Sequence, residues 1–361
     1  MTMLGSREEL KVYVWKRLIY VLIFDFGILS SILFISREEA NVVDNCFYVK
    51  DFVDSKFAIG AARDSEKIAE EFMKRLRGEF DDKEFADLLI VSGFIPDLYD
   101  NDSSEETLFS KMIEALVAEW ARRMGFKSSL IRQKSSYEDV LITIDCSSIV
   151  CDAKSFRLGR SQKAPNVKDF LKPEDMRNWM TKYTNAIGGL VTYPCTHEWK
   201  KTSDVFVHCS DKDTPVVILP YKYLAFTLEY KERYSTDSLI GLWDYSSIFP
   251  NKLPKNCKGG NVAAYWETMN KAITDITKTD EQDLKKFMKT ADGHIQEAVD
   301  EHIKFLNQIV KEREVRVRQA FENYDDIDKL RKDIIRMNIE KETANLRTLI
   351  KRIKSFRKIQ T

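Results

Sequence analysis

Two acidic residues and a lysine have the types and spacing needed to hydrolyse a phosphodiester bond. Asp139 precedes one apolar run, and Asp152-Ala153-Lys154 ends the next. Side chains of a strand alternate between faces, so Asp152 and Lys154 point the same way, and a hairpin brings Asp139 within reach of both. Two buried carboxylates repel each other unless a cation lies between them. The pattern therefore predicts a metal site at one end of a buried sheet.

Magnesium is the cation that this donor set predicts. Mg²⁺ takes one or two carboxylates, keeps several waters and adds phosphate oxygens of a substrate. We expect Asp139 and Asp152 as metal ligands, with the Ala153 carbonyl as a further oxygen ligand and Mn²⁺ as a substitute ion. Lys154 would then lie beside the scissile phosphate, where it can orient or help to deprotonate the attacking water and stabilise the developing charge.

The predicted hairpin positions these residues. Its strands are Asp139–Asp145 and Ile149–Lys154, joined by a short turn. Apolar runs of strand length follow, and the expected strands are Gly189–Tyr193, Val205–Cys209 and Pro215–Leu219. A helix is predicted to begin near Tyr221.

Helices are predicted before and after the strands. An amphipathic helix begins at about Asp64, Asp82 can cap a second helix, and a long helix runs from Glu105 to Met124 with Ser103 or Ser104 as its cap. From about Tyr265 the chain is predicted to be helical to its end. The fold class is α/β, with a mixed central sheet flanked by helices.

Charge and cysteine content exclude several classes of protein. The 361 residues carry 57 basic and 57 acidic side chains, so a basic coat over the whole surface is excluded and a polyanion must meet a local patch. Six cysteines are too few for a disulfide scaffold, and reduced thiols in a cytoplasm are expected. The spacing of Cys195, His197, His208 and Cys209 matches no standard zinc motif.

Two segments are locally basic. Lys154–Lys182 has eight basic and three acidic residues, and Lys341–Thr361 has seven basic residues against Glu342 alone. Such stretches are typical of phosphate contact, and a solvated helix face is the alternative for the second.

The residues around Lys154 resemble a known active site. Cys151–Leu158, followed by Arg160, is similar to the active-site segment of the HindIII family of type II restriction endonucleases, which are PD-(D/E)XK nucleases. Gly93–Pro96 and Glu106–Lys111 resemble an upstream segment of the same family. The similarity extends over roughly residues 60 to 355 and excludes about the first fifty.

The resemblance implies a restriction-endonuclease-like core with a helical C-terminal region. It implies a homodimer that cuts double-stranded DNA at a short palindrome and leaves 5′-phosphates, with AAGCTT as one candidate sequence. It also implies a restriction-modification system, in which a cognate methyltransferase acts on the same site, and no membrane partner. A strand-nicking or heterodimeric enzyme is the alternative within the same class.

The resemblance also assigns roles to residues. It implies Asp139 and Asp152 as metal ligands and Lys154 as the catalytic lysine. Glu138 stands where such nucleases often have proline, so Asp145 competes as the first acid. Glu114 is a further catalytic candidate, with an exposed helix acid as the alternative. Beyond the site, the candidates for DNA binding are Ser155, Arg157, Arg160 and Lys163. The alternative role for these residues is structural ion pairing.

Three segments divide the chain. Residues 1–55 form an N-terminal extension, 56–265 the nuclease core, and 266–361 a helical region for dimerisation and DNA contact. Within the extension, Leu18–Ile35 is mostly apolar and carries a single charge, Asp25. Its length suits a membrane span, but a charge at mid-span costs about 2.5–3.5 kcal/mol. A non-catalytic, membrane-associated DNA-binding protein is therefore the alternative from another class.

Overall fold

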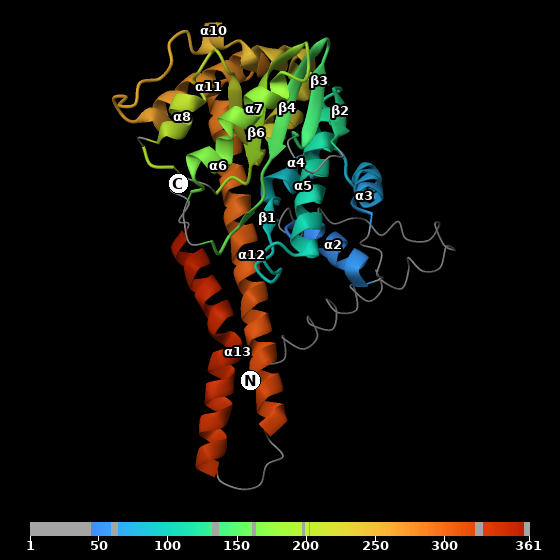
Figure 1. Ribbon diagram of the computed structural model, residues 1–361, viewed down its shortest axis with the longest axis vertical. Coiled ribbons are helices and arrows are strands. Elements are labelled where there is room, and N and C mark those ends of the chain that lie inside the picture. The colour runs from blue at the N-terminus through green and yellow to red at the C-terminus, as the bar shows by residue number, and fades with distance from the viewer. Residues whose placement is uncertain are drawn as a thin grey trace, which may run out of the picture. The chain divides into compact units, whose positions relative to one another are not determined.

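The computed structural model describes residues 45–58, 64–131, 137–160, 164–196, 199–201, 203–321 and 328–356 (Figure 1). The chain divides into two units, and all of these residues belong to the second, Val42–Thr361. The first unit, Met1–Asn41, and with it the apolar run Leu18–Ile35, lies outside the described residues. No helix in the described ranges has the length and apolar character that crossing a membrane requires.

A five-stranded mixed sheet forms the centre of the second unit, in the order β2-β3-β4-β6-β7. Its strands are β2 Lys127–Leu130, β3 Val140–Ile144, β4 Ser147–Ala153, β6 Ala186–Tyr193 and β7 Val216–Pro220. β2, β3 and β4 pair antiparallel, whereas β4, β6 and β7 pair parallel. The carboxyl ends of β4, β6 and β7 therefore meet at one edge, where ligands bind in many α/β proteins. A separate parallel pair joins β1 Phe94–Ile95 to β5 Phe156–Arg157.

Helices cover both faces of this sheet. One face is covered by α5 (Ser104–Arg123), α9 (Tyr221–Glu229) and the 3-10 helix η3 (Thr236–Trp243). These elements place Trp120, Thr227 and Trp243 around the same group of sheet residues. Next to β6, Trp243 approaches Gly188, while Met176 of α7 (Pro173–Met180) approaches Gly189. Since consecutive strand residues face opposite ways, α7 covers the other face (Figure 1).

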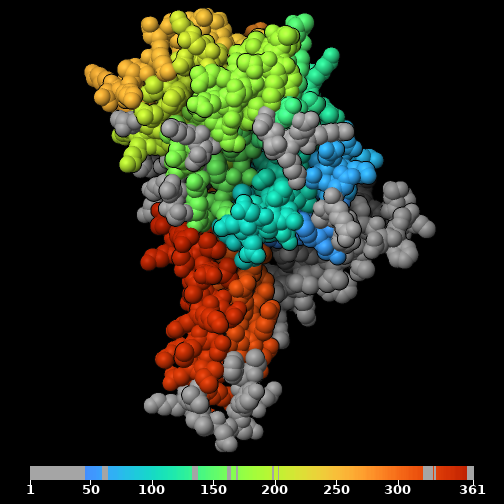
Figure 2. Space-filling view, in the orientation of Figure 1, coloured from blue at the N-terminus to red at the C-terminus, as the bar shows by residue number. Residues whose placement is uncertain are grey.

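The remaining helices surround this core and form the C-terminal region. They are α2 Tyr48–Ala58, α3 Ser65–Glu79, α4 Asp82–Val91, α6 Val167–Leu171, α8 Asp204–His208, η2 Lys231–Arg233, α10 Tyr245–Ile248, α11 Asn261–Thr277, α12 Glu281–Phe321 and α13 Asp328–Phe356. The two long helices α12 and α13 lie side by side (Figures 1 and 2). Arg347 of α13 pairs with Glu314 of α12.

Most of the predicted elements are confirmed, and two predictions are wrong. Ser103 caps α5 as expected, and the hairpin of β3 and β4 lies where the alternation placed it. Val205–Cys209 is not a strand but is mostly the short helix α8, capped by Ser203; a brief apolar run fits a buried strand and a buried helical turn equally well. The cap of α4 is Asp81 rather than Asp82, because Glu84 completes a capping box with Asp81.

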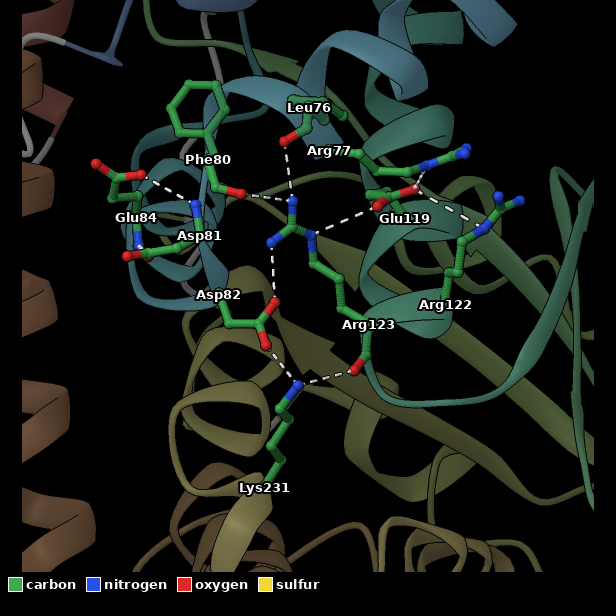
Figure 3. A network of polar contacts seen from close by, with 10 residues as sticks. All are labelled: Leu76, Arg77, Phe80, Asp81, Asp82, Glu84, Glu119, Arg122, Arg123 and Lys231. Atoms are coloured by element: carbon green, nitrogen blue, oxygen red, sulfur yellow. Dashed lines mark hydrogen bonds and ion pairs between the residues drawn. The ribbon is translucent and has the colours of Figure 1, made fainter. Parts of the chain in front are cut away.

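A network of charges joins the helices behind the sheet (Figure 3). Glu119 of α5 has 1% of its side chain exposed and pairs with Arg77 of α3 at 3.1 Å and Arg123 at 3.5 Å. Arg123 also pairs with Asp82 at 2.9 Å and donates to the carbonyls of Leu76 and Phe80. Three helices are thus held together by one buried guanidinium.

Replacing Arg123 by methionine is expected to lower the free energy of unfolding by about 3 kcal/mol, because it leaves buried acceptors without their donor. Lys271, which pairs with Asp275 on an exposed helix face, is the control. Its replacement by methionine should cost less than about 0.5 kcal/mol. Urea unfolding measures both, and equal losses would contradict a special role for the buried pair.

Candidate active site

Asp139 and Asp152 lie next to each other at the end of the β3–β4 hairpin. The register of the two strands ends with Val140 opposite Cys151, and the Asp139 N–H donates to the carbonyl of that same Cys151 at 3.0 Å. The Asp139 Oδ2 accepts from the Ala153 N–H at 2.9 Å. The first acid is thereby tied to the segment that carries the second.

Lys154 completes the group from the same strand end. Its Nζ lies 2.5 Å from the Oδ2 of Asp152, whose exposed fraction is only 3%. Its backbone N–H donates to the Thr192 carbonyl of β6 at 2.8 Å, which continues the β4–β6 ladder. The alternation of the strand therefore places Asp152 and Lys154 on one side.

Glu114 approaches this group from α5. Its Oε2 accepts from the Lys111 Nζ at 2.5 Å, and the same ammonium donates to the Ile131 carbonyl at 3.1 Å. Burial, followed by the negative charges of Asp152 and Glu114, raises the pKa of Asp139 well above its usual value. Glu114 is thus close enough to act on Asp139 electrostatically and is only 16% exposed, unlike the exposed helix acid of the alternative.

The donor set fits a hard divalent cation. Asp152 and Glu114 contribute to the raised pKa of Asp139, and a positive charge between such carboxylates would stabilise their ionised forms. Within the described ranges, no three or more His, Cys, Asp or Glu side chains are arranged to hold a metal by themselves. Mg²⁺ needs no such cage, because one or two carboxylates, waters and substrate oxygens complete its shell.

Asp145 lies at the other end of the hairpin. It is exposed in the turn between β3 and β4 with a φ of 51°. Five strand residues separate it from Asp139, which places the two residues about 20 Å apart along the strand. This position favours Asp139 over Asp145 as the first acid.

Two of the residues that follow Lys154 contact other parts of the protein through their side chains. The Ser155 Oγ lies 3.0 Å from the Oγ of Ser110 on α5. Arg157 donates to the carbonyls of Pro96 at 3.0 Å and Tyr99 at 2.8 Å, and pairs with Glu106 at 3.0 Å. These contacts favour the alternative of a structural role for Arg157.

Arg160 differs from Arg157 in its surroundings. Its guanidinium lies over the Phe156 ring at 5.3 Å, and among the described residues no carboxylate pairs with it. Burial lowers its pKa, so an anion beside it would be favoured. Lys163, the fourth DNA-binding candidate, lies outside the described residues, as does His197 of the dismissed zinc pattern.

Helix α13 contacts the segment that follows Lys154 (Figure 2). Arg352 donates to the Gly159 carbonyl at 3.3 Å, and the Gly159 N–H donates to Asp97 at 3.3 Å. A Cβ at Gly159 would lie 2.6 Å from Leu349. Burial, only partly offset by Arg157 and Arg352, raises the pKa of Asp97 to about 6.

Replacing Asp97 by asparagine should change the pH dependence of stability. A folded pKa of about 6 lies above the unfolded value of about 3.9, so ionised Asp97 opposes folding, and wild type loses stability as pH rises between these values. The Asp97→Asn variant lacks this loss of stability, because asparagine does not ionise. From pH 4 to pH 7.5 the stability of the variant relative to wild type should rise by about 2 kcal/mol in urea unfolding. A difference that stays constant with pH would contradict this prediction.

Two residues near the site were not found from the sequence. Lys111 holds Glu114, and its spacing of three residues on a helix was a signal for such a pair. Tyr221 donates its hydroxyl hydrogen to the Lys154 carbonyl at 2.6 Å, across 67 residues of sequence. No local pattern predicts that contact.

Most of this chain is similar in sequence to known proteins. The family model for the HindIII restriction endonuclease matches residues 51–338, which include the sheet and the candidate site. The type II restriction enzyme HindIII of Haemophilus influenzae is 25% identical over 278 residues, covering 75% of this chain and 85% of that protein. The chain therefore belongs to the HindIII restriction endonuclease family and is a restriction endonuclease that acts on DNA.

Proposed function

We propose that this protein is a type II endonuclease of the PD-(D/E)XK class that cuts both strands of DNA at a short palindrome and depends on Mg²⁺. The observation that carries the proposal is the convergence of Asp139, Asp152 and Lys154 at one end of the β3–β4 hairpin. The products are 5′-phosphate and 3′-hydroxyl ends. Because one site cuts one strand, a double-strand cut calls for a two-fold homodimer.

The roles of the residues follow from their positions. Asp139, Asp152 and the Ala153 carbonyl would hold Mg²⁺, or Mn²⁺ in its place, with Glu114 as a further acid beside them. The bound ion supplies positive charge that offsets the carboxylates and the charge developing on the phosphate. Lys154 hydrogen-bonds and orients the attacking water, and its ammonium stabilises charge on the phosphate oxygens.

DNA contact is proposed for the residues beyond Lys154 and for the C-terminal region, 266–361. Arg160 has a guanidinium without a carboxylate partner in the described structure and can clamp a phosphate or a guanine edge. Ser155 and Lys163 are proposed as further contacts from the same segment. Helices α12 and α13 are the proposed dimerisation elements.

The proposed setting is a restriction-modification system in the cytoplasm. All six cysteines are free thiols, which suits a reducing compartment. A cognate methyltransferase would protect the same sequence in the host DNA.

A plasmid digest tests the proposed function. Supercoiled plasmids that together contain many short palindromes, AAGCTT among them, are incubated with the protein and Mg²⁺, Mn²⁺ or EDTA. Discrete linear fragments with 5′-phosphates, absent in EDTA, are expected, and sequencing their ends identifies the target. Nicked circles without linear product would contradict double-strand cleavage, and intact plasmid with either metal would contradict the nuclease activity itself.

A further inference from the structure

The backbone of Lys154 is held on both sides by hydrogen bonds. Its N–H donates to Thr192 of β6, and its carbonyl accepts from the hydroxyl of Tyr221 at 2.6 Å. We propose that Tyr221 is a positioning residue, which fixes Lys154 in the orientation needed for cleavage. This inference rests on the proposed role of Lys154.

The sheet topology explains how Tyr221 reaches Lys154. Because β4, β6 and β7 are parallel, the residues that follow each strand lie at the same edge. Lys154 follows β4, and Tyr221 follows β7 as the first residue of α9. The tyrosine ring therefore spans the end of β6, and its hydroxyl reaches the strand beyond.

The position of the ring is tightly constrained. Tyr221 is only 1% exposed, and it lies against Gly93, where a Cβ would be 2.6 Å from the ring and 2.6 Å from Pro194. The φ of Gly93 is 90°, and its carbonyl accepts from the N–H of Phe156, two residues beyond Lys154. Since a glycine both packs on the ring and bonds to the catalytic segment, the ring and the segment hold each other in place.

The Tyr221 hydroxyl keeps its proton near neutral pH and can therefore donate this hydrogen bond. Burial, reinforced by Cys151, Asp139 and Asp152, raises the pKa of Tyr221 well above its usual value, so it stays a neutral donor. Removing the hydroxyl would leave the Lys154 carbonyl without this donor. The strand end would then relax, and a displacement of about 1 Å at a reacting group can reduce a rate about 100-fold.

Tyr221→Phe tests this role, with Tyr245→Phe as its matched control. Tyr245 is also 1% exposed and donates its hydroxyl to a carbonyl of β7, Val216 at 2.9 Å, but at the strand end away from Lys154. Tyr221→Phe loses one hydrogen bond to the sheet, whereas Tyr245→Phe loses a bond to the sheet and the contact of its hydroxyl with Tyr265, so the melting temperature of Tyr245→Phe should fall at least as much. Single-turnover cleavage with Mg²⁺ measures the rate, and binding to cleavable DNA in Ca²⁺ measures the affinity.

We expect Tyr221→Phe to cleave about ten- to a hundred-fold more slowly, with DNA affinity within about twofold of wild type. Tyr245→Phe should keep at least about half of the wild-type rate. In a Lys154→Ala background, Tyr221→Phe should cause no further loss, because the tyrosine acts through that lysine.

Three results would overturn the role of Tyr221 while leaving the proposed function intact. These are equal rates for the two phenylalanine variants, a full further loss in the Lys154→Ala background, or a Tyr221→Phe chain that fails to fold where Tyr245→Phe folds. An inactive wild type would instead overturn the proposed function, on which this role depends.

Discussion

Asp152→Asn is expected to lower the rate of DNA cleavage more than about 1000-fold, which corresponds to more than about 4 kcal/mol in the activation free energy. The change keeps the size of the side chain and removes its charge. Asp152 is 3% exposed and is the ion-pair partner of Lys154, so the neutral amide would both weaken the cation site and release the lysine. Single-turnover cleavage of a plasmid with Mg²⁺ measures the loss.

Asp145→Asn is the matched control for this loss. It makes the same chemical change in the same hairpin, at the exposed turn. Its rate should stay within about twofold of wild type, since surface substitutions away from a site rarely matter by more than about 0.5 kcal/mol. An active Asp152→Asn would contradict the role of Asp152, and a large loss in Asp145→Asn would favour Asp145 over Asp139 as the first acid. Binding to DNA in Ca²⁺ separates a chemical defect from a loss of affinity.

Lys154→Ala is expected to lower the cleavage rate about 100- to 10,000-fold, the range for removing a positioned acid–base or electrostatic group. Lys154→Arg should restore little, because a planar guanidinium cannot occupy the place of a compact ammonium beside Asp152. The rates are measured at saturating enzyme over a range of pH. Equal cleavage rates for Lys154→Arg and wild type would show that only a positive charge is needed at this position.

Lys222→Ala provides the control for burial and ion pairing. Lys222 has 16% of its side chain exposed and lies 2.5 Å from Asp292, close to the 13% and 2.5 Å of Lys154. Its loss should lower stability as much as Lys154→Ala does while the cleavage rate stays within about threefold of wild type. If both variants lose activity equally, a folding defect explains the result for Lys154.

Much of the candidate site follows from local sequence. The alternation of β3 and β4, with acids at their ends, places Asp139 beside Asp152 and Lys154, because strand pairing across a short turn has a narrow choice of register. The cap of α5 at Ser103 and the C-terminal helices follow in the same way from residue types and helical spacing. These features depend on neighbours in the chain.

The rest was decided by tertiary structure. Arg157 has the sequence position of a DNA contact, yet the carbonyls of the Pro96–Tyr99 loop and Glu106 surround its guanidinium. Val205–Cys209 has the composition of a strand and forms mainly a helical turn. Tyr221 reaches Lys154 only because β4, β6 and β7 are parallel and in that order. Local patterns specify elements and short turns, whereas contacts across tens of residues depend on how those elements pack, which no single stretch of sequence encodes.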